Sequence, residues 1–173
     1  MRASDLKPAA VSVHLTDRPR DDELDLFGLT HRGLVRRENQ DHFLLATVHR
    51  QVRIHGTSLP AAEALPLRGE RLATLLLVAD GVGGGAAGSE ASRVAIEAIT
   101  RYVSSTLRCY HATGTAAEDE LLGTLRQAAL EAHAAVLAEA AGNPDSAGMA
   151  TTLTLALAVW PWAYVVQVGD SRC

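Results

Sequence analysis

An apolar segment that ends in an aspartate and several glycines is the part of this sequence best suited to chemistry. Residues 75–85 read Leu-Leu-Leu-Val-Ala-Asp-Gly-Val-Gly-Gly-Gly. A buried strand of this kind delivers the carboxylate of Asp80 to the rim of a sheet, and Gly81 lets the backbone approach a ligand because it has no Cβ. Since Mg²⁺ and Mn²⁺ prefer carboxylate and carbonyl oxygens, the segment predicts part of a divalent-metal site.

Three further segments carry groups that suit the same chemistry. Residues 33–41 (Gly-Leu-Val-Arg-Arg-Glu-Asn-Gln-Asp) place a guanidinium, able to bind phosphate oxygens bidentately, before a carboxylate at a strand start. Residues 148–152 (Gly-Met-Ala-Thr-Thr) open an apolar strand, and residues 168–172 (Val-Gly-Asp-Ser-Arg) repeat the strand-to-aspartate pattern. Taken singly, a surface ion pair and β-branched strand formers explain the first two equally well. The order and spacing of all four segments are much more specific.

The periodicity of apolar residues predicts the elements that position these groups. Alternating or continuous apolar residues predict strands at 24–29, 43–48, 72–79, 149–160 and 162–168. Apolar residues at helical spacing predict helices over 91–103 and 121–136. Because two consecutive helices lie between groups of strands, an α+β layered fold is favoured over a doubly wound sheet. Residues 1–22 are expected to form a flexible N-terminal tail before a domain of residues 23–173.

Composition narrows the class of protein. The 173 residues are 47% hydrophobic with a net charge of −4, which suits one globular domain and argues against a nucleic-acid partner. The two cysteines, Cys109 and Cys173, indicate no disulfide framework and fit a cytoplasmic location. Neither a signal peptide nor a membrane segment is expected, because residues 1–25 are charged and Pro161 interrupts the apolar stretch 153–168.

The four segments together resemble the N-terminal part of bacterial-type metal-dependent protein phosphatases, the PPM or type 2C family. The resemblance runs from about Leu24 to the last residue and rests on four motifs: Gly33–Asp41, Asp80–Gly84, Gly148–Thr152 and Gly169–Arg172. It implies a layered α/β/β/α sandwich of two antiparallel sheets flanked by helix pairs. It also implies hydrolysis of phosphoserine and phosphothreonine by a metal-activated water at a two-metal centre, as part of signal transduction.

The resemblance also implies roles for individual residues. Arg36 would bind the substrate phosphate, Asp80 would bridge two Mn²⁺ or Mg²⁺ ions, and the Gly81 carbonyl would bind one of them. Asp41 would join the metal site through a hydrogen bond to a metal-bound water. Asp170 matches an aspartate that binds a third metal ion in some members. Phosphorylated proteins are the implied substrates, and a cognate serine/threonine kinase is the implied partner.

Two departures from the family pattern bear on activity. Members carry two further metal-binding aspartates after the Gly-Asp-Ser-Arg motif, whereas this sequence ends at Cys173. We therefore expect a C-terminally incomplete domain, with weak or no activity by itself. Gln40 stands where many members have glutamate, which removes one negative charge near the metals.

A non-catalytic, phosphatase-like module is the main alternative. Such a module would use Arg36 to bind phosphorylated segments, or would regulate a partner protein. A nucleotide-binding interpretation is weaker: Gly81, Gly83 and Ala86 fit a dinucleotide fingerprint, but Asp80 would repel a pyrophosphate. The helix is also followed by a second helix, where that fingerprint requires a strand.

Overall fold

The computed structural model describes residues 18–51, 53–55, 57, 68–84, 86–106 and 115–173. The described elements, in chain order, are the 3₁₀ turn η1 (Asp21–Glu23), strands β1 (Asp41–Gln51) and β2 (Arg68–Val82), helices α1 (Ala87–Thr106) and α2 (Thr115–Gly142), the 3₁₀ turn η3 (Pro144–Ser146), and strands β3 (Ala150–Thr151), β4 (Leu153–Val159) and β5 (Trp162–Val168).

The strands form one antiparallel sheet in the order β1-β2-β4-β5, and the short β3 pairs with the end of β2. β2 is the long central strand. Its partner β1 precedes it in the sequence, and its partner β4 follows only after both helices. This arrangement brings the start of β1 to the end of β2. Their ladder sets Asp41 opposite Asp80.

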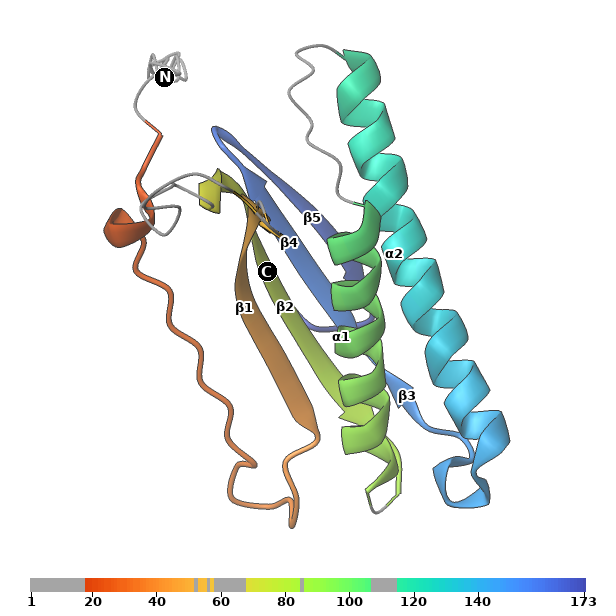
Figure 1. Ribbon diagram of the computed structural model, residues 1–173. Coiled ribbons are helices and arrows are strands. Elements are labelled where there is room, and N and C mark those ends of the chain that lie inside the picture. Colours follow the sequence, from red (N-terminus) through yellow and green to blue (C-terminus); the bar gives the residue numbers. More distant parts are fainter. Residues whose placement is uncertain (1–17, 52, 56, 58–67, 85, 107–114) are drawn as a thin grey trace, which may run out of the picture.

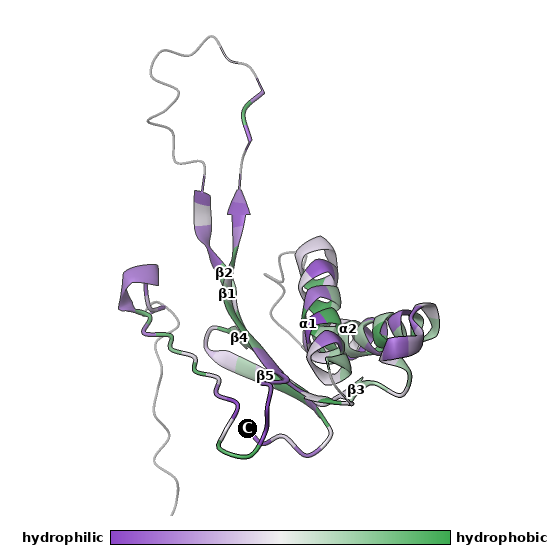
Figure 2. Cartoon of the chain, turned by 90° about the horizontal axis from the view of Figure 1, so that it is seen from below, coloured by the Kyte–Doolittle hydropathy of each residue, from purple (hydrophilic) through white to green (hydrophobic). Residues whose placement is uncertain are grey.

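Both helices cover one face of this sheet (Figures 1 and 2). Alternation along β2 explains the packing, because successive strand residues point to opposite faces. Leu75, Leu77 and Ala79 are at most 2% exposed, whereas the intervening Val78 is 47% exposed. The buried residues therefore lie on the helix side.

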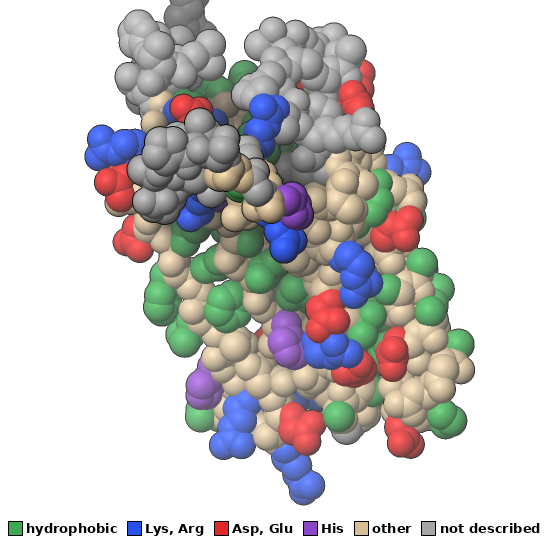
Figure 3. All heavy atoms as spheres, viewed as in Figure 1, with side chains coloured by type: hydrophobic (Ala, Val, Ile, Leu, Met, Phe, Trp, Pro, Cys, Tyr) green, Lys and Arg blue, Asp and Glu red, His purple; other side chains and the backbone are tan. Residues whose placement is uncertain are grey.

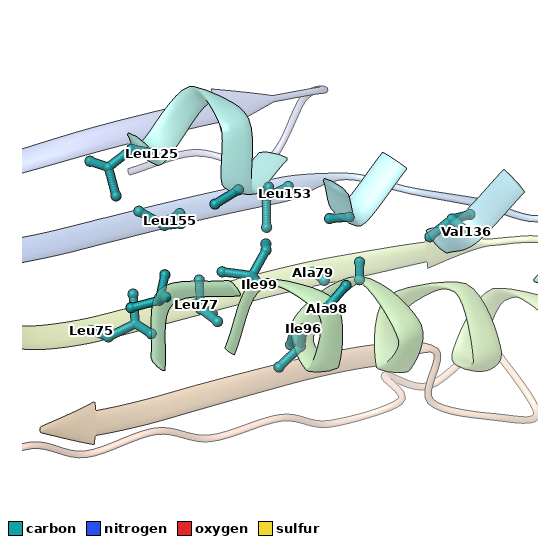
Figure 4. Packing of buried hydrophobic residues seen from close by; sticks show 14 of the residues in the cluster. Leu75, Leu77, Ala79, Ile96, Ala98, Ile99, Leu125, Val136, Leu153 and Leu155 are labelled. Atoms are coloured by element: carbon teal, nitrogen blue, oxygen red, sulfur yellow. The ribbon is translucent and has the colours of Figure 1, made fainter. Parts of the chain in front are cut away.

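The core forms where α1 and α2 meet β2 and β4 (Figure 4). Ile99 of α1 and Leu125 of α2 are fully buried there, together with Leu155 of β4. Alanines such as Ala91 and Ala95 contribute little volume on the inner side of α1, which lets the helix lie close to the sheet.

The segment before β1 lies on the opposite side of the sheet from the helices (Figure 2). A Cβ on Gly28 would lie 2.3 Å from the ring of Phe43 in β1, so the segment passes directly over that side chain. Hydrophobic side chains gather along this segment at the left of Figure 3, where Phe27 and Leu29 are about 80% exposed (82% and 79%).

The prediction of a strand at residues 24–29 is wrong, because none of these residues pairs with a strand. Alternating residues supply two faces, but a strand also needs a neighbour whose backbone groups it can bond. The other predicted strands and both helices are present, and most are longer than predicted.

The α+β class is confirmed, with mixed helix and antiparallel sheet. Within the described residues, one sheet and one helix pair are formed, which are two of the four layers predicted. Of the predicted tail, residues 1–17 lie outside the described part. The carboxylate of Asp21 contacts the guanidinium of Arg71 at 2.9 Å, so the end of that segment is held against β2.

Among the described helices, none combines the length and the apolar character that a membrane span requires.

Candidate active site

Two carboxylates face each other at one end of the sheet. Asp41 is the first residue of β1 and Asp80 lies near the end of β2, and the two are direct partners in the antiparallel ladder. Directly opposed residues have Cβ atoms about 5 Å apart and point to the same side. Both carboxylates lie on the face opposite the helices, in line with Phe43 and Val78.

The loop before β1 brings cationic groups to the same place, and its own hydrogen bonds hold it. The Asn39 amide donates to the Thr30 hydroxyl at 2.7 Å, and the Arg32 guanidinium donates to the Arg37 carbonyl oxygen at 3.3 Å. The resulting pocket of about 80 Å³ is lined by His31, Arg32, Arg36, Glu38, Asn39, Gln40, Asp41, Asp80 and Gly81. A phosphate-sized anion could therefore meet guanidinium and carboxylate groups together.

Two threonines of the Gly-Met-Ala-Thr-Thr segment hold the backbone of Asp80. Its N–H donates to the Thr152 hydroxyl at 3.1 Å, and its carbonyl oxygen accepts from the Thr152 N–H at 2.9 Å and the Thr151 hydroxyl at 3.0 Å. The Thr152 hydroxyl also hydrogen bonds with that of Ser171 at 2.6 Å. The Gly-Met-Ala-Thr-Thr segment thus holds Asp80 in place, and Ser171 of the Gly-Asp-Ser-Arg segment bonds to one of the two threonines.

Close contacts join the start of α1 to the strand ends. The carbonyl oxygen of Gly88 occupies the space that a side chain at Gly81 would need. The Gln40 carbonyl oxygen accepts from the Gly81 N–H at 3.1 Å and from the buried Ser92 hydroxyl at 2.6 Å. These contacts fix the position of α1 relative to the pocket.

The pKa of the Asp41 carboxyl group lies above its usual value. Burial raises the pKa of Asp41, the negative charge of Asp80 and a side-chain hydrogen bond to Asp80 raise it further, and His42 opposes the shift. Two carboxylates in this arrangement favour the binding of a proton or a cation between them.

The donor set fits part of a divalent-metal site. Within the described ranges, no group of three or more His, Cys, Asp or Glu side chains could hold a metal ion. Mg²⁺, however, is commonly held by one or two carboxylates, with water and substrate phosphate completing the shell. The mutual repulsion of Asp41 and Asp80 fits such a cation, with backbone oxygens nearby.

The structure brings together four of the five residues predicted for the site. Arg36, Asp41, Asp80 and Gly81 line one pocket, whereas the exposed Asp170 follows β5 and is not among the lining residues.

Sequence reasoning did not single out His31, which lines the pocket. It also missed the clamping threonines Thr151 and Thr152, which it treated as ordinary strand formers. The nearness of His31 to Arg36 in one loop was the available signal.

Comparison with known proteins shows which family this chain resembles. A family model described as protein phosphatase 2C matches residues 59–173. Serine/threonine protein phosphatase PstP of Mycobacterium tuberculosis, in strains CDC 1551 / Oshkosh and ATCC 25618 / H37Rv, is 36% identical over 100 residues, which are 58% of this chain and 18% of the relative.

Among solved structures, the catalytic domain of serine threonine protein phosphatase PstP in complex with two manganese ions is similar, with a TM-score of 0.54 and 29% identity. The match covers 83% of this chain and 47% of that domain. This chain thus spans about half of the solved domain and less than a fifth of the full-length relatives.

Proposed function

This chain belongs to the protein phosphatase 2C family, and from that premise we propose that it acts as a metal-dependent protein serine/threonine phosphatase. The observation that carries the proposal is the pocket in which Arg36 lies with the paired carboxylates of Asp41 and Asp80. The names of the mycobacterial relatives support this activity. Because the chain spans only part of those relatives, the activity, substrates and partners of the whole protein all belong to the proposal.

Arg36 would bind the phosphoryl group of the substrate. Its side chain is exposed in the loop, and no carboxylate of the described residues forms an ion pair with it. A guanidinium in this state can give two parallel N–H donors to phosphate oxygens. It would hold the phosphoryl group beside the carboxylates and offset the negative charge that develops on its oxygens.

Asp41, Asp80 and Gly81 would hold Mn²⁺ or Mg²⁺. The support is the position of Asp41 and Asp80 as direct partners in the strand ladder, with the pKa of Asp41 raised by burial and then by the negative charge of Asp80. A bound divalent cation supplies positive charge that acidifies water and offsets charge on phosphoryl oxygens. The backbone clamp on Asp80 keeps its carboxylate in position for this cation. A third metal ion at Asp170 stays a prediction.

Phosphorylated proteins are the proposed substrates. A cognate serine/threonine kinase as partner and a cytoplasmic location remain predictions from the family resemblance and from cysteine usage.

Hydrolysis of a phosphothreonine peptide in Mn²⁺ tests the proposal. Arg36→Ala should lower kcat/KM about 100-fold, the loss expected when one charge-stabilising donor is removed. Arg37→Ala is the matched control, because Arg37 is the exposed neighbour that does not line the pocket. Asp80→Asn should abolish the Mn²⁺ dependence.

Equal activity of the Arg36→Ala and Arg37→Ala variants would contradict the assigned role of Arg36. Tight binding of the phosphopeptide without turnover, lost in Arg36→Ala, would instead identify a non-catalytic phosphopeptide-binding module.

A further inference from the structure

His31 and Arg36 line the same pocket, and we propose that His31 is a phosphate-binding residue, whose imidazole donates a hydrogen bond from Nε2 to the substrate phosphoryl group. This inference rests on the proposed function and names one more residue that would contact its substrate. It starts from the position of the imidazole: His31 and Arg36 line the same pocket, with four residues between them in the sequence.

A backbone hydrogen bond fixes the state of the His31 ring. The N–H of Gly33 approaches Nδ1 of His31 at 2.9 Å. A backbone N–H can only donate, so Nδ1 must be the acceptor and carries no proton. In the neutral ring, the proton then resides on Nε2, which leaves one N–H donor directed away from the Gly33 bond.

The turn that makes this bond is built into the loop. Gly33 has a φ of +74°, a left-handed conformation that glycine adopts without strain. It lets the loop turn directly after the Gly33 N–H that donates to the His31 ring. The ring orientation is therefore set by the backbone before any ligand binds.

The pocket offers groups of both signs of charge. Its lining residues include two guanidinium groups, Arg32 and Arg36, and three carboxylates, Glu38, Asp41 and Asp80. An imidazole N–H forms a strong hydrogen bond to an anionic phosphoryl oxygen, because one partner carries charge.

The same bond argues against His31 as a proton donor to the leaving group. That role requires the imidazolium form, in which both ring nitrogens carry protons. Protonated Nδ1 would then face the Gly33 N–H, so two donors would oppose each other. His31 is therefore assigned to binding and positioning of the phosphoryl group.

Two substitutions distinguish the role of the acceptor Nδ1 from that of the donor Nε2. His31→Asn keeps a short acceptor that can reach the Gly33 N–H but lacks a donor at the distance of Nε2. His31→Gln places an amide N–H₂ near the position of Nε2. His133→Asn is the control, because His133 is an exposed histidine on α2 outside this pocket.

The first measurement is calorimetric binding of inorganic phosphate to the 173-residue chain in Mg²⁺. His31→Asn should weaken binding about tenfold, within the range for one hydrogen bond to a charged group. His31→Gln and His133→Asn should stay within threefold of the parent. With the phosphothreonine peptide, His31→Asn should raise KM by a similar factor and leave kcat within twofold.

Nitrogen NMR of the unsubstituted protein reports on the His31 ring nitrogens directly, so the result does not depend on whether a variant folds. It should find Nδ1 of His31 unprotonated, and phosphate in Mg²⁺ should shift the Nε2 signal. An unshifted signal, or parent-like phosphate binding and KM in His31→Asn, would overturn the proposal. If phosphate binding depends on His31 but the parent never hydrolyses the peptide, the proposed catalytic function fails while the assignment of His31 stands.

Discussion

The carbonyl oxygen of Gly88 sits where the side chain of any other residue at position 81 would begin. A Cβ built on Gly81 would lie 1.9 Å from that oxygen and 2.7 Å from the Gln40 carbonyl oxygen. Both obstacles are backbone atoms, so no side-chain rotation can relieve the overlap. Gly81 therefore lets the first turn of α1 meet the ends of β1 and β2 beside the pocket.

Gly81→Ala should lower the free energy of unfolding by about 2–3 kcal/mol, the upper part of the range for overpacking. The reason is that α1 must move away from the strand ends to admit the methyl group. Urea unfolding followed by circular dichroism measures this change. Gly84→Ala is the control, since nothing lies within 4 Å of a Cβ at that position. Equal stability of the two variants would contradict the close contact.

The elements that could be predicted from the sequence are those in which the spacing of apolar residues reveals the buried face. β2 and α1 were predicted because apolar residues repeat with the periods of a strand and a helix. Asp80 was predicted from its position at the end of an apolar run. The role of Thr152 could not be predicted, because it depends on a contact with Asp80 across 72 residues of chain. Residues 24–29 alternate like a strand, but no neighbouring strand pairs with them.

Replacing Asp80 should stabilise the metal-free protein at neutral pH. The pKa of Asp41 is raised by burial and then by Asp80, so in the folded state the ionised form of Asp41 is disfavoured. A raised carboxyl pKa means that the folded state holds its proton more tightly than the unfolded state. The stability contributed by that proton is present at low pH and is lost as the pH rises through the folded pKa.

Asp80→Asn removes the repulsion between the two carboxylates and should raise Tm at pH 7 by about 1–3 °C. The expected rise is small because Asp80 is exposed and solvent screens the interaction. The gain should shrink as the pH falls through the raised pKa of Asp41. Adding Mn²⁺ should raise the Tm of the parent but not of the variant. Asp25→Asn, the same change at an exposed site outside the pocket, should alter neither result. A lower Tm for metal-free Asp80→Asn would refute the repulsion.

Thr152→Val tests the backbone clamp on Asp80. Valine keeps the shape of threonine but removes the hydroxyl, so the Asp80 N–H loses its partner at 3.1 Å. A donor left unpaired at a partly buried site costs about 1–3 kcal/mol, and unfolding by urea should show a loss in this range.

The same strand region offers a matched control for that substitution. The Thr154 hydroxyl oxygen is buried and has no hydrogen-bond partner in the described part of the chain. Thr154→Val should therefore leave stability unchanged or increase it, because it removes a polar group that bonds to nothing. A larger loss in Thr154→Val than in Thr152→Val would show that side-chain packing, and not the hydrogen bond to Asp80, dominates at these positions.

Arg71→Met should release the segment that precedes the loop carrying His31 and Arg36. Arg71 is 7% exposed, and its guanidinium donates to the Asp21 carboxylate at 2.9 Å and to the Pro19 carbonyl oxygen at 2.7 Å. Methionine fills much of the same space without either bond. Because Asp21 is half-exposed, we expect a loss of about 1–2 kcal/mol, less than for a fully buried pair.

Hydrogen exchange measured by mass spectrometry should show faster exchange in Arg71→Met over residues 18–30. Arg93→Met is the comparison: Arg93 pairs with Glu90 and Glu97 on the surface of α1, where ion pairs contribute little. The loop that carries His31 and Arg36 has its own hydrogen bonds, so exchange there should change less than at residues 18–30. Uniform acceleration across both stretches would mean that Arg71 also supports the loop carrying His31 and Arg36, and the segment and loop would then act as one unit.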